Sequence, residues 1–244
     1  MPIAYLEWRS FKFAEEEKLL QWGANLAKYQ VSPIMAKKVA RGRVKFEPGC
    51  VVAGSVDLVK HALRAHGKEL PVENSYPECL KPLLFRHVQK LSTLREAKAL
   101  LDKGRELFIK PVAVKRFTGF VTMDSYDPRF NGASASAPCW ISEPVEFVSE
   151  WRAYIVDGAI QQVCFAPGSG DESRKPNIPT MHDAVKAMTA AGAPIGYALD
   201  FGVLSNGLTA LVEMNDGYSL GAYENLDADV YWELISKRWL EMVE

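Results

Sequence analysis

The chain has 244 residues, of which 48% are hydrophobic and 24% are charged, and its formal net charge is −1. This composition is typical of a globular protein with a sizeable core, and the near-neutral charge argues against a general nucleic-acid or membrane surface. No apolar run approaches the ~20 residues that cross a bilayer. Glu7 and Arg9 interrupt the N-terminal apolar stretch, so we expect no signal peptide. The four cysteines show no CxxC spacing and are expected to be reduced thiols of a cytoplasmic protein.

The N-terminal part of the chain alternates strand-like and helix-like patterns. Ile3–Trp8 is a candidate strand, and Phe13–Tyr29 carries apolar residues near helical spacing. Cys50–Ala53 is a second short apolar run, followed by Gly54-Ser55, where Ser55 can cap a helix over Val56–His66. A strand, a tight turn and a helix form a βα unit, so residues 1–105 are predicted to form an α/β domain.

The remaining chain is richer in strands and turns. Pro77–Leu101 is predicted to hold one or two helices, and the pattern changes after Gly104. The elements expected beyond it are a buried strand at Leu107–Pro111, a loop over Asp124–Pro138, a hairpin over Trp151–Phe165 that turns at Asp157-Gly158, a helix over Thr180–Ala191 and a closing helix over Asp227–Val243.

A central hairpin is predicted where two apolar runs, Gly196–Leu204 and Leu208–Met214, flank Asn206-Gly207. A two-residue loop would place Ser205 opposite Leu208, Phe201 opposite Val212 and Asp200 opposite Glu213. Asn215 lies two residues beyond Glu213 and therefore projects from the same face. Opposed carboxylates repel unless a cation lies between them, and Mg²⁺ takes oxygen ligands that it shares with nucleotide phosphates. The alternative is that Asp200, Glu213 and Asn215 are solvated residues at strand ends.

Two lysines are candidates for anion binding. Lys110 lies inside an apolar strand, where its ammonium group needs water or an anion. Lys115 follows five residues later, and Thr118-Gly119 beyond it can offer backbone N–H groups to a phosphate. The alternative for both is an edge-strand lysine that deters aggregation.

The segment Ile141–Arg152 carries three glutamates among apolar residues. Such an extended segment can present backbone groups to a purine and a carboxylate to ribose hydroxyls, with Glu143, Glu146 and Glu150 as the candidates. Glu146 can equally be a solvated residue. Arg152 opens the second hairpin, and its fork can bind a phosphate or a carboxylate. Arg174 and Lys175 can do the same from a loop.

Two short matches to protein kinases also occur. Val112–Lys115 is similar to the kinase V-A-I-K strand, and Asp200-Phe201-Gly202 to the kinase D-F-G. The sequence lacks a G-x-G-x-x-G loop before Lys115 and an H-R-D-x-x-x-x-N segment between the two matches, so a protein kinase is disfavoured.

The order of these motifs resembles the ATP-grasp superfamily, and within it a group related to the RimK-type ligases. The resemblance covers about Leu107–Tyr223 and rests on FIKP, KRFTG, ISEPVEF, EWR and the combination of Asp200 with EMND. The superfamily holds ATP between two α+β subdomains. This chain departs from it in a loop after Lys115 that is poorer in glycine, and in Asp216-Gly217 in place of Ser/Thr-Pro-Gly.

The resemblance implies a role for each candidate residue. Arg152 and Lys115 would be catalytic, and Arg152 would stabilise the transferring phosphate or the acyl phosphate. The nucleotide would be bound through its phosphates by Lys110 and Lys115, through adenine by Glu143, Pro144 and Val145, and through ribose by Glu150 or Glu146. Mg²⁺ would be held by Asp200, Glu213 and Asn215.

The resemblance further implies an ATP- and Mg²⁺-dependent ligase that joins a carboxylate to an amine or thiol through an acyl phosphate. An N-terminal α/β domain over residues 1–105 would precede the ATP-grasp domain over residues 106–244. The alternatives are a phosphotransferase that uses the same ATP site and a non-catalytic nucleotide-binding module. We expect small-molecule or peptide substrates, no nucleic acid or membrane partner, and a monomer or homodimer.

Overall fold

The computed structural model describes residues 1–9, 12–112 and 117–244. Contacts group these residues into two compact units. The first combines Met1–Leu80 with Phe147–Glu244, and the second is Lys81–Glu146. This grouping follows compactness and cuts the chain at other places than the expected division into residues 1–105 and 106–244, which stays a prediction.

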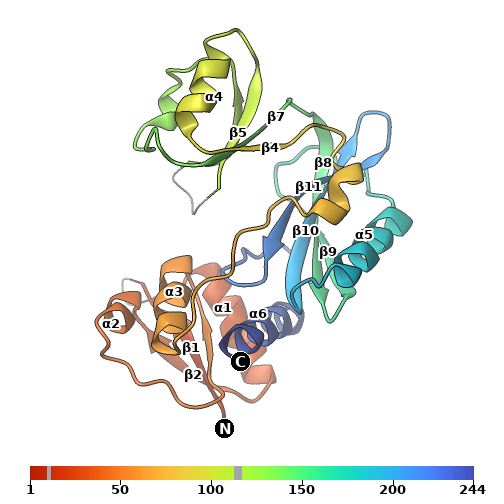
Figure 1. The fold of residues 1–244 in the computed structure, drawn as a ribbon. Coiled ribbons are helices and arrows are strands. Elements are labelled where there is room, and N and C mark those ends of the chain that lie inside the picture. The colour runs from red at the N-terminus through yellow and green to blue at the C-terminus, as the bar shows by residue number, and fades with distance from the viewer. Residues whose placement is uncertain (10–11, 113–116) are drawn as a thin grey trace. The chain divides into compact units, whose positions relative to one another are not determined.

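A parallel sheet forms the N-terminal part of the first unit (Figure 1). Its strands lie in the order β2-β1-β3, and the helices α1, α2 and α3 follow them along the chain. Ser55 accepts a hydrogen bond from the Leu58 N–H at 3.3 Å and thereby caps α3, as predicted. The bounds are β1 Ile3–Glu7, α1 Glu15–Leu26, β2 Gln30–Ile34, α2 Ala36–Ala40, β3 Val51–Ala53 and α3 Val56–Ala65.

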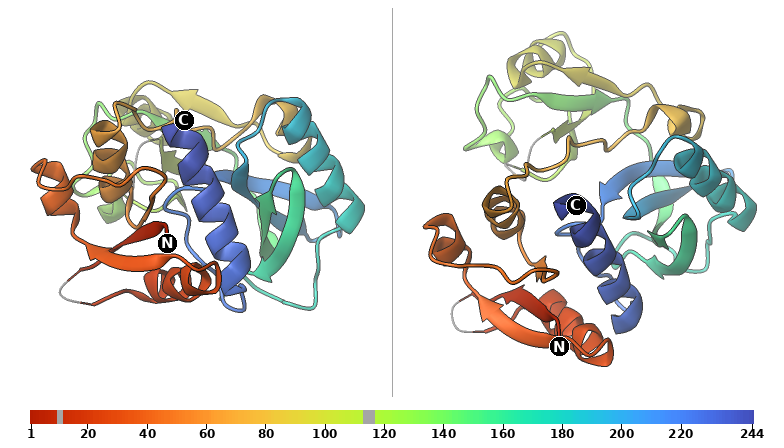
Figure 2. Two further views of the ribbon diagram at one scale, coloured as in Figure 1. Left: turned by 90° about the horizontal axis from the view of Figure 1, so that it is seen from below. Right: turned by 60° about the horizontal axis from the view of Figure 1, so that its bottom comes forward.

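An antiparallel sheet in the order β11-β10-β8-β9 forms the rest of this unit. Its two hairpins agree with the prediction, and Asp157 and Gly158 have φ of 52° and 71°, as a type I′ turn requires. Helix α6 packs along α1 and also contacts β3, β8 and β10, which joins the two sheets (Figure 2). The bounds are β8 Phe147–Val156, β9 Ala159–Phe165, α5 Ile178–Ala190, β10 Gly196–Leu204, β11 Thr209–Asp216 and α6 Ala228–Val243.

The tip of the central hairpin differs from the expected two-residue turn. The Gly207 N–H donates to the Leu204 carbonyl at 2.8 Å, and the Leu204 N–H donates to the Leu208 carbonyl, also at 2.8 Å. The loop therefore has three residues, with Gly207 in the left-handed region at φ 85°. The predicted pairing of Ser205 with Leu208 is wrong, because the added loop residue shifts the register.

A β-bulge then restores the register near the middle of the hairpin. Phe201 pairs with Leu211, and not with Val212 as predicted, whereas Asp200 pairs with Glu213. Val212 is thus the extra residue on β11. A bulge adds one residue to one strand and re-aims the side chains beside it, so the predicted facing of Asp200 and Glu213 is confirmed.

The end of β11 is anchored to α6 through Asp216. Its carboxylate accepts two hydrogen bonds from Arg238, from Nε at 2.6 Å and from Nη2 at 2.7 Å. Gly217 packs so closely on Gly196 that a Cβ there would lie 2.2 Å from the Gly196 carbonyl oxygen. Asp216-Gly217 therefore has a structural use at the point where the ATP-grasp pattern has Ser/Thr-Pro-Gly.

The second unit is a small antiparallel sheet in the order β4-β7-β5-β6. Its core includes Leu94 and Ala97 of α4 with Leu107 and Ile109 of β5. The bounds are β4 Gln89–Leu91, α4 Leu94–Leu101, β5 Leu107–Pro111, β6 Phe120–Thr122, the 3-10 helix η2 Pro128–Phe130 and β7 Cys139–Ser142.

The segment expected to hold one or two helices, Pro77–Leu101, is more varied. It contains the 3-10 helix η1 Glu78–Leu83, strand β4 and helix α4. Pro82 lies inside η1, and proline in a helix interior removes a hydrogen-bond donor and disfavours the longer α-helix. Gln89–Leu91 is extended because it pairs with β7. Among the described residues, every helix is too short or too polar to cross a bilayer.

Neighbouring residues of α6 provide a test of how the loop after β11 is anchored. Arg238→Ala is expected to lower the free energy of unfolding by about 2–4 kcal/mol, because it leaves the Asp216 carboxylate without its partner in a mostly buried site. Lys237→Ala, which removes a cation that is 35% exposed beside Asp157 and Glu233, is expected to change it by no more than about 0.5 kcal/mol. Urea unfolding measures both, and equal losses would contradict the assignment.

Candidate functional site

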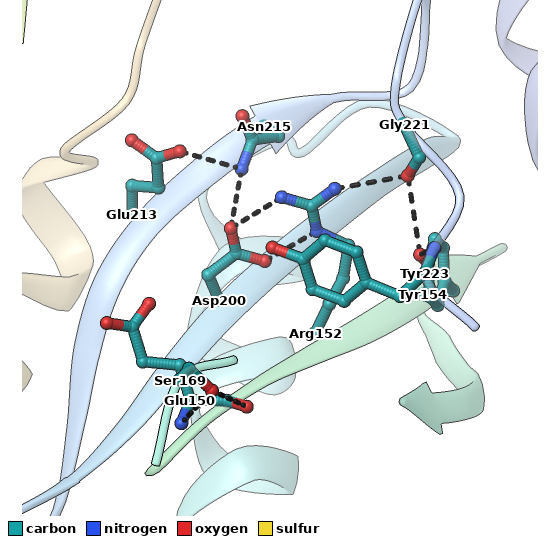
Figure 3. A network of polar contacts seen from close by, with 9 residues as sticks. All are labelled: Glu150, Arg152, Tyr154, Ser169, Asp200, Glu213, Asn215, Gly221 and Tyr223. Carbon is teal, nitrogen blue, oxygen red and sulfur yellow. Dashed lines mark hydrogen bonds and ion pairs between the residues drawn. The ribbon is translucent and has the colours of Figure 1, made fainter. Parts of the chain in front are cut away.

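Two carboxylates and an amide meet in the middle of the antiparallel sheet (Figure 3). Asp200 of β10 faces Glu213 of β11, and Asn215 lies two residues further along β11. The Asn215 Nδ2 group donates to the Asp200 Oδ2 atom at 3.1 Å and to the Glu213 Oε1 atom at 3.3 Å. An N–H donor thus lies between two acceptors. The structure brings the three predicted metal ligands together.

Arg152 approaches the same carboxylate from the other side of β10. It is the register partner of Asp200 on β8, and its Nε and Nη2 atoms each donate to one Asp200 oxygen at 2.7 Å. Both side chains are buried, with 9% and 8% of their surface exposed. Burial alone lowers the pKa of Arg152, but the charge and hydrogen bonds of Asp200 outweigh it and hold that pKa above its usual value. The pair is therefore ionised.

The loop that follows β11 also contacts Arg152, through residues that sequence analysis did not single out. The Arg152 Nη1 atom donates to the Gly221 carbonyl at 3.1 Å, and the guanidinium carbon lies 4.2 Å from the centre of the Tyr223 ring. Tyr154 donates from its hydroxyl to the same carbonyl at 3.3 Å and accepts from the Tyr223 N–H at 2.9 Å. Burial raises the pKa of Tyr154 to about 12, so its hydroxyl remains a donor near neutral pH.

One sequence signal for Tyr154 exists. It lies two residues after Arg152 on the same strand, and residues at that spacing share a face of a sheet. No comparable pattern marks Gly221 or Tyr223, because residues 217–227 form no helix or strand and their contacts depend on tertiary packing.

Glu150 lies on the same face of β8, two residues before Arg152. Its side chain is half-buried, and its backbone N–H donates to the Ser169 hydroxyl at 3.0 Å. Figure 3 shows its carboxylate pointing to the same side as that of Glu213. By contrast, the Lys175 ammonium lies 5.9 Å from the Trp151 ring, and Trp151 faces away from Arg152. The loop cation Lys175, predicted as an alternative anion ligand, therefore lies by the other face of the sheet.

The donor set can be compared with the needs of a metal ion. Two carboxylates and an amide oxygen are hard ligands of the type that Mg²⁺ binds, and Mg²⁺ usually completes its shell with water and phosphate oxygens. Rotation of the Asn215 amide would turn its oxygen toward the two carboxylates. In residues 1–9, 12–112 and 117–244, no group of three or more His, Cys, Asp or Glu residues can hold a metal ion. Asp200, Glu213 and Asn215 thus fit a metal whose remaining ligands come from a bound nucleotide.

The second unit carries the other candidates. Lys110 is half-buried on β5, opposite Trp140 of β7, on the face away from the core residue Ile109. Lys115 lies outside the described residues. The Glu143 carboxylate accepts a hydrogen bond from the His87 N–H at 2.8 Å, and backbone N–H groups, its own and that of His87, lower its pKa. The rest of this segment is accessible to different degrees, with Pro144 and Glu146 exposed and Val145 half-buried.

Comparisons with known proteins give the same architecture. Residues 85–234 match a family model of the ATP-grasp domain, the second family of its clade. The fold is similar to that of the D-cycloserine synthetase DcsG, at 11% identity over 97% of this chain and 99% of that one, with a TM-score of 0.65.

Two further solved structures are similar in fold. The D-alanine–D-alanine ligase from Bacillus anthracis is 12% identical over 100% of this chain and 97% of that one, with a TM-score of 0.58. The macrocyclase MdnC from Microcystis aeruginosa MRC, bound to its precursor peptide MdnA, is 12% identical over 99% of both chains, with a TM-score of 0.56. Curated proteins give no match.

The expected ATP-grasp fold is therefore confirmed, since the family model spans more than half of the chain and the solved structures cover nearly all of it. The chain belongs to this family of ATP-grasp domains.

Proposed function

We propose that this protein is an ATP- and Mg²⁺-dependent ligase that joins a carboxylate to an amine or thiol through an acyl phosphate. The observation that carries the proposal is the facing of Asp200 and Glu213 across β10 and β11, with Asn215 between them. Membership of the ATP-grasp family supports it. Solved proteins with the same fold include ligases that act on a small molecule and on a precursor peptide.

Asp200, Glu213 and Asn215 are proposed to hold Mg²⁺. A metal bound there would neutralise the charge of the ATP phosphates and so favour phosphoryl transfer. The two carboxylates supply negative charge at fixed positions. The amide of Asn215 would exchange its N–H contacts for an oxygen contact when a cation replaces it between the carboxylates.

Arg152 is proposed to have two tasks. It fixes Asp200 through a bidentate ion pair, and it can still bind a phosphate. A guanidinium has five N–H donors, of which three bind Asp200 and Gly221 in the hydrogen bonds described above. The remaining two can contact a phosphate or acyl-phosphate oxygen. The positive charge would then stabilise the transferring group without further reorganisation.

The nucleotide contacts remain the predicted ones. Lys110 and Lys115 are proposed to bind phosphates, and Glu146 or Glu150 to bind ribose. The Glu143 carboxylate is engaged by the His87 N–H, so the adenine contacts at Glu143, Pro144 and Val145 would come mainly from their backbone. Two catalytic roles, those of Arg152 and Lys115, rest on the resemblance.

A kinase-like phosphotransferase is the second candidate, but one observation counts against it. Asp200-Phe201-Gly202 lies inside β10, which pairs with β8 on one side and β11 on the other. Phe201 is fully buried. A D-F-G that opens a kinase activation loop would leave the strand at this point. We further propose a cytoplasmic location and small-molecule or peptide substrates.

Loss of one metal ligand gives the first test of the proposal. Glu213→Gln keeps the shape of the side chain and spares the buried Arg152–Asp200 pair, so the fold is expected to persist. Its Mg²⁺-dependent affinity for a non-hydrolysable ATP analogue is expected to fall by roughly tenfold or more, because even residues that only support a metal ligand cost about that much. Titration calorimetry with and without Mg²⁺ measures the change.

The matched control is Glu224→Gln, an exposed carboxylate outside the site, which is expected to bind the analogue as the wild type does. Unchanged affinity of Glu213→Gln in the presence of Mg²⁺ would reject the metal site. Asp200→Ala is a poorer choice for this test, because it also leaves Arg152 charged and buried.

The Arg152–Asp200 pair is tested by a double-mutant cycle. Arg152→Met or Asp200→Asn alone is expected to cost about 3–5 kcal/mol of unfolding free energy, because each disrupts a buried ion pair. The double variant is expected to cost clearly less than the sum. In the exposed pair Lys18–Glu15, the same cycle should give a coupling of at most about 0.5 kcal/mol. Additive losses at Arg152 and Asp200 would show that the pair is not the anchor of the site.

Product analysis separates the ligase from the phosphotransferase. ATP, Mg²⁺ and a mixture of amino acids and acidic peptides should give ADP together with an amide. Hydroxylamine in place of the amine should trap the acyl phosphate as a hydroxamate. A phosphorylated hydroxyl product, formed without an amine and without hydroxamate, would establish the phosphotransferase instead. Mass spectrometry distinguishes these products.

A further inference from the structure

The N-terminal part of the first unit carries a basic surface that the proposed chemistry does not use. No acidic residue occurs between Glu17 and Glu47. Towards the end of this stretch lie five cationic side chains that are all exposed, and we call them the basic surface: Lys37, Lys38, Arg41, Arg43 and Lys45. The formal net charge of the whole chain is only −1, so this surface is a local concentration of positive charge.

The backbone that carries the basic surface is held in place. Val39 of α2 is buried in the core with 6% exposure. The chain reverses at Gly42, which has φ 63°, and the Arg43 N–H donates to the Lys38 carbonyl at 3.0 Å. Beyond the turn, half-buried Val44 alternates with exposed neighbours and packs against the core. The cations therefore point outward because the apolar side chains between them pack inward.

The Phe46 ring, which ends this segment, is packed against Tyr5 with ring centroids 5.3 Å apart and against His66 at 5.2 Å. It is consequently not available for stacking on a partner. Between residues 31 and 47, all of which the structure describes, no aromatic side chain is exposed.

None of the five cations has an ion pair or hydrogen bond from its side chain to another part of the described chain. Like charges at this spacing repel one another, and a surface of one sign attracts oppositely charged molecules over about a Debye length, ~8 Å at physiological salt. A built surface of unpaired cations on a fixed backbone is suited to an anionic partner.

The position of the basic surface relates it to the site within the same compact unit. Strand β2 ends at Ile34, and α2 begins two residues later at Ala36, so the surface follows the carboxyl edge of the parallel sheet. Gly54 follows β3 at that edge, and its carbonyl accepts a hydrogen bond from the Ser219 hydroxyl at 2.7 Å. Ser219 belongs to the loop after β11 that also contacts Arg152. Carboxyl edges of parallel sheets are where ligands commonly bind.

We propose that the basic surface binds an acidic segment of the substrate, a peptide rich in aspartate or glutamate. The proposal rests on the proposed ligase function, because the carboxylate that such an enzyme activates would belong to the same acidic chain. A single-stranded nucleic acid is the weaker candidate, since it is bound through stacking on exposed aromatic rings in addition to charge, and this surface exposes none.

Binding is tested on the full chain without ATP or Mg²⁺, so that the result does not depend on catalysis. The probe is a fluorescein-labelled peptide of alternating glutamate and serine, followed by fluorescence anisotropy. The triple variant Lys37→Glu/Arg41→Glu/Arg43→Glu should weaken binding by roughly tenfold or more, since surface charge pairs contribute up to about 1 kcal/mol each. Binding of the wild-type chain should also weaken as salt rises.

The matched control reverses three exposed lysines elsewhere, Lys18→Glu/Lys103→Glu/Lys186→Glu. It has the same net charge as the test variant and should bind the peptide nearly as the wild type does. Equal weakening in both variants would reduce the effect to net charge and overturn the proposal. So would tighter binding of a single-stranded RNA that carries the same charge as the peptide.

Failure of this proposal and failure of the ligase function are distinguishable. Glu213→Gln should bind the acidic peptide like the wild type, whereas it should lose Mg²⁺-dependent nucleotide affinity. Absence of peptide binding with intact nucleotide binding would overturn the basic surface and leave the ligase proposal standing.

Discussion

The bidentate ion pair between Arg152 and Asp200 is the interaction on which the arrangement of the site depends. Both side chains are more than nine-tenths buried, and a buried carboxylate beside a second one, Glu213, is costly without a cation. Arg152 supplies that cation from the neighbouring strand and fixes how Asp200 presents its oxygens. The same guanidinium binds Gly221 and stacks on Tyr223. One side chain therefore positions both the acidic pair and the loop after β11.

The facing of Asp200 and Glu213 is predictable from sequence, although the predicted turn is wrong. Counting from a two-residue turn at Asn206-Gly207 leads to the right pair because two departures cancel. The loop has one residue more than expected, and the bulge adds Val212 to β11. Local patterns favour an Asn-Gly turn of either length, and the bulge depends on packing across three strands. The hairpins, the βα unit and the helix ends are accessible because their signals are local.

What sequence analysis could not supply depends on contacts between distant segments. Gln89–Leu91 is a strand only because β7 pairs with it, and Tyr223 reaches the site only because Tyr154 accepts its N–H. Neither contact leaves a period in the sequence. The predicted partners of the nucleotide in the second unit come from a family resemblance, which gives residue roles but not their side-chain contacts. The hydrogen bond between Glu143 and His87 is such a contact.

The loop after β11 is fixed at both ends, and this limits where substrate choice can arise. Its start is held by the Asp216–Arg238 pair and by the close approach of Gly217 to Gly196. Its end is held where Tyr154 binds the Tyr223 N–H. An altered residue at either end would disturb the anchors before it changed a substrate contact. Selectivity in this loop must therefore come from the few residues between, which include Ser219 with its hydrogen bond to the edge of the N-terminal sheet. That edge also bears the basic surface, so specificity would be shared between two sheets, and phosphoryl transfer would depend on the residues around Asp200.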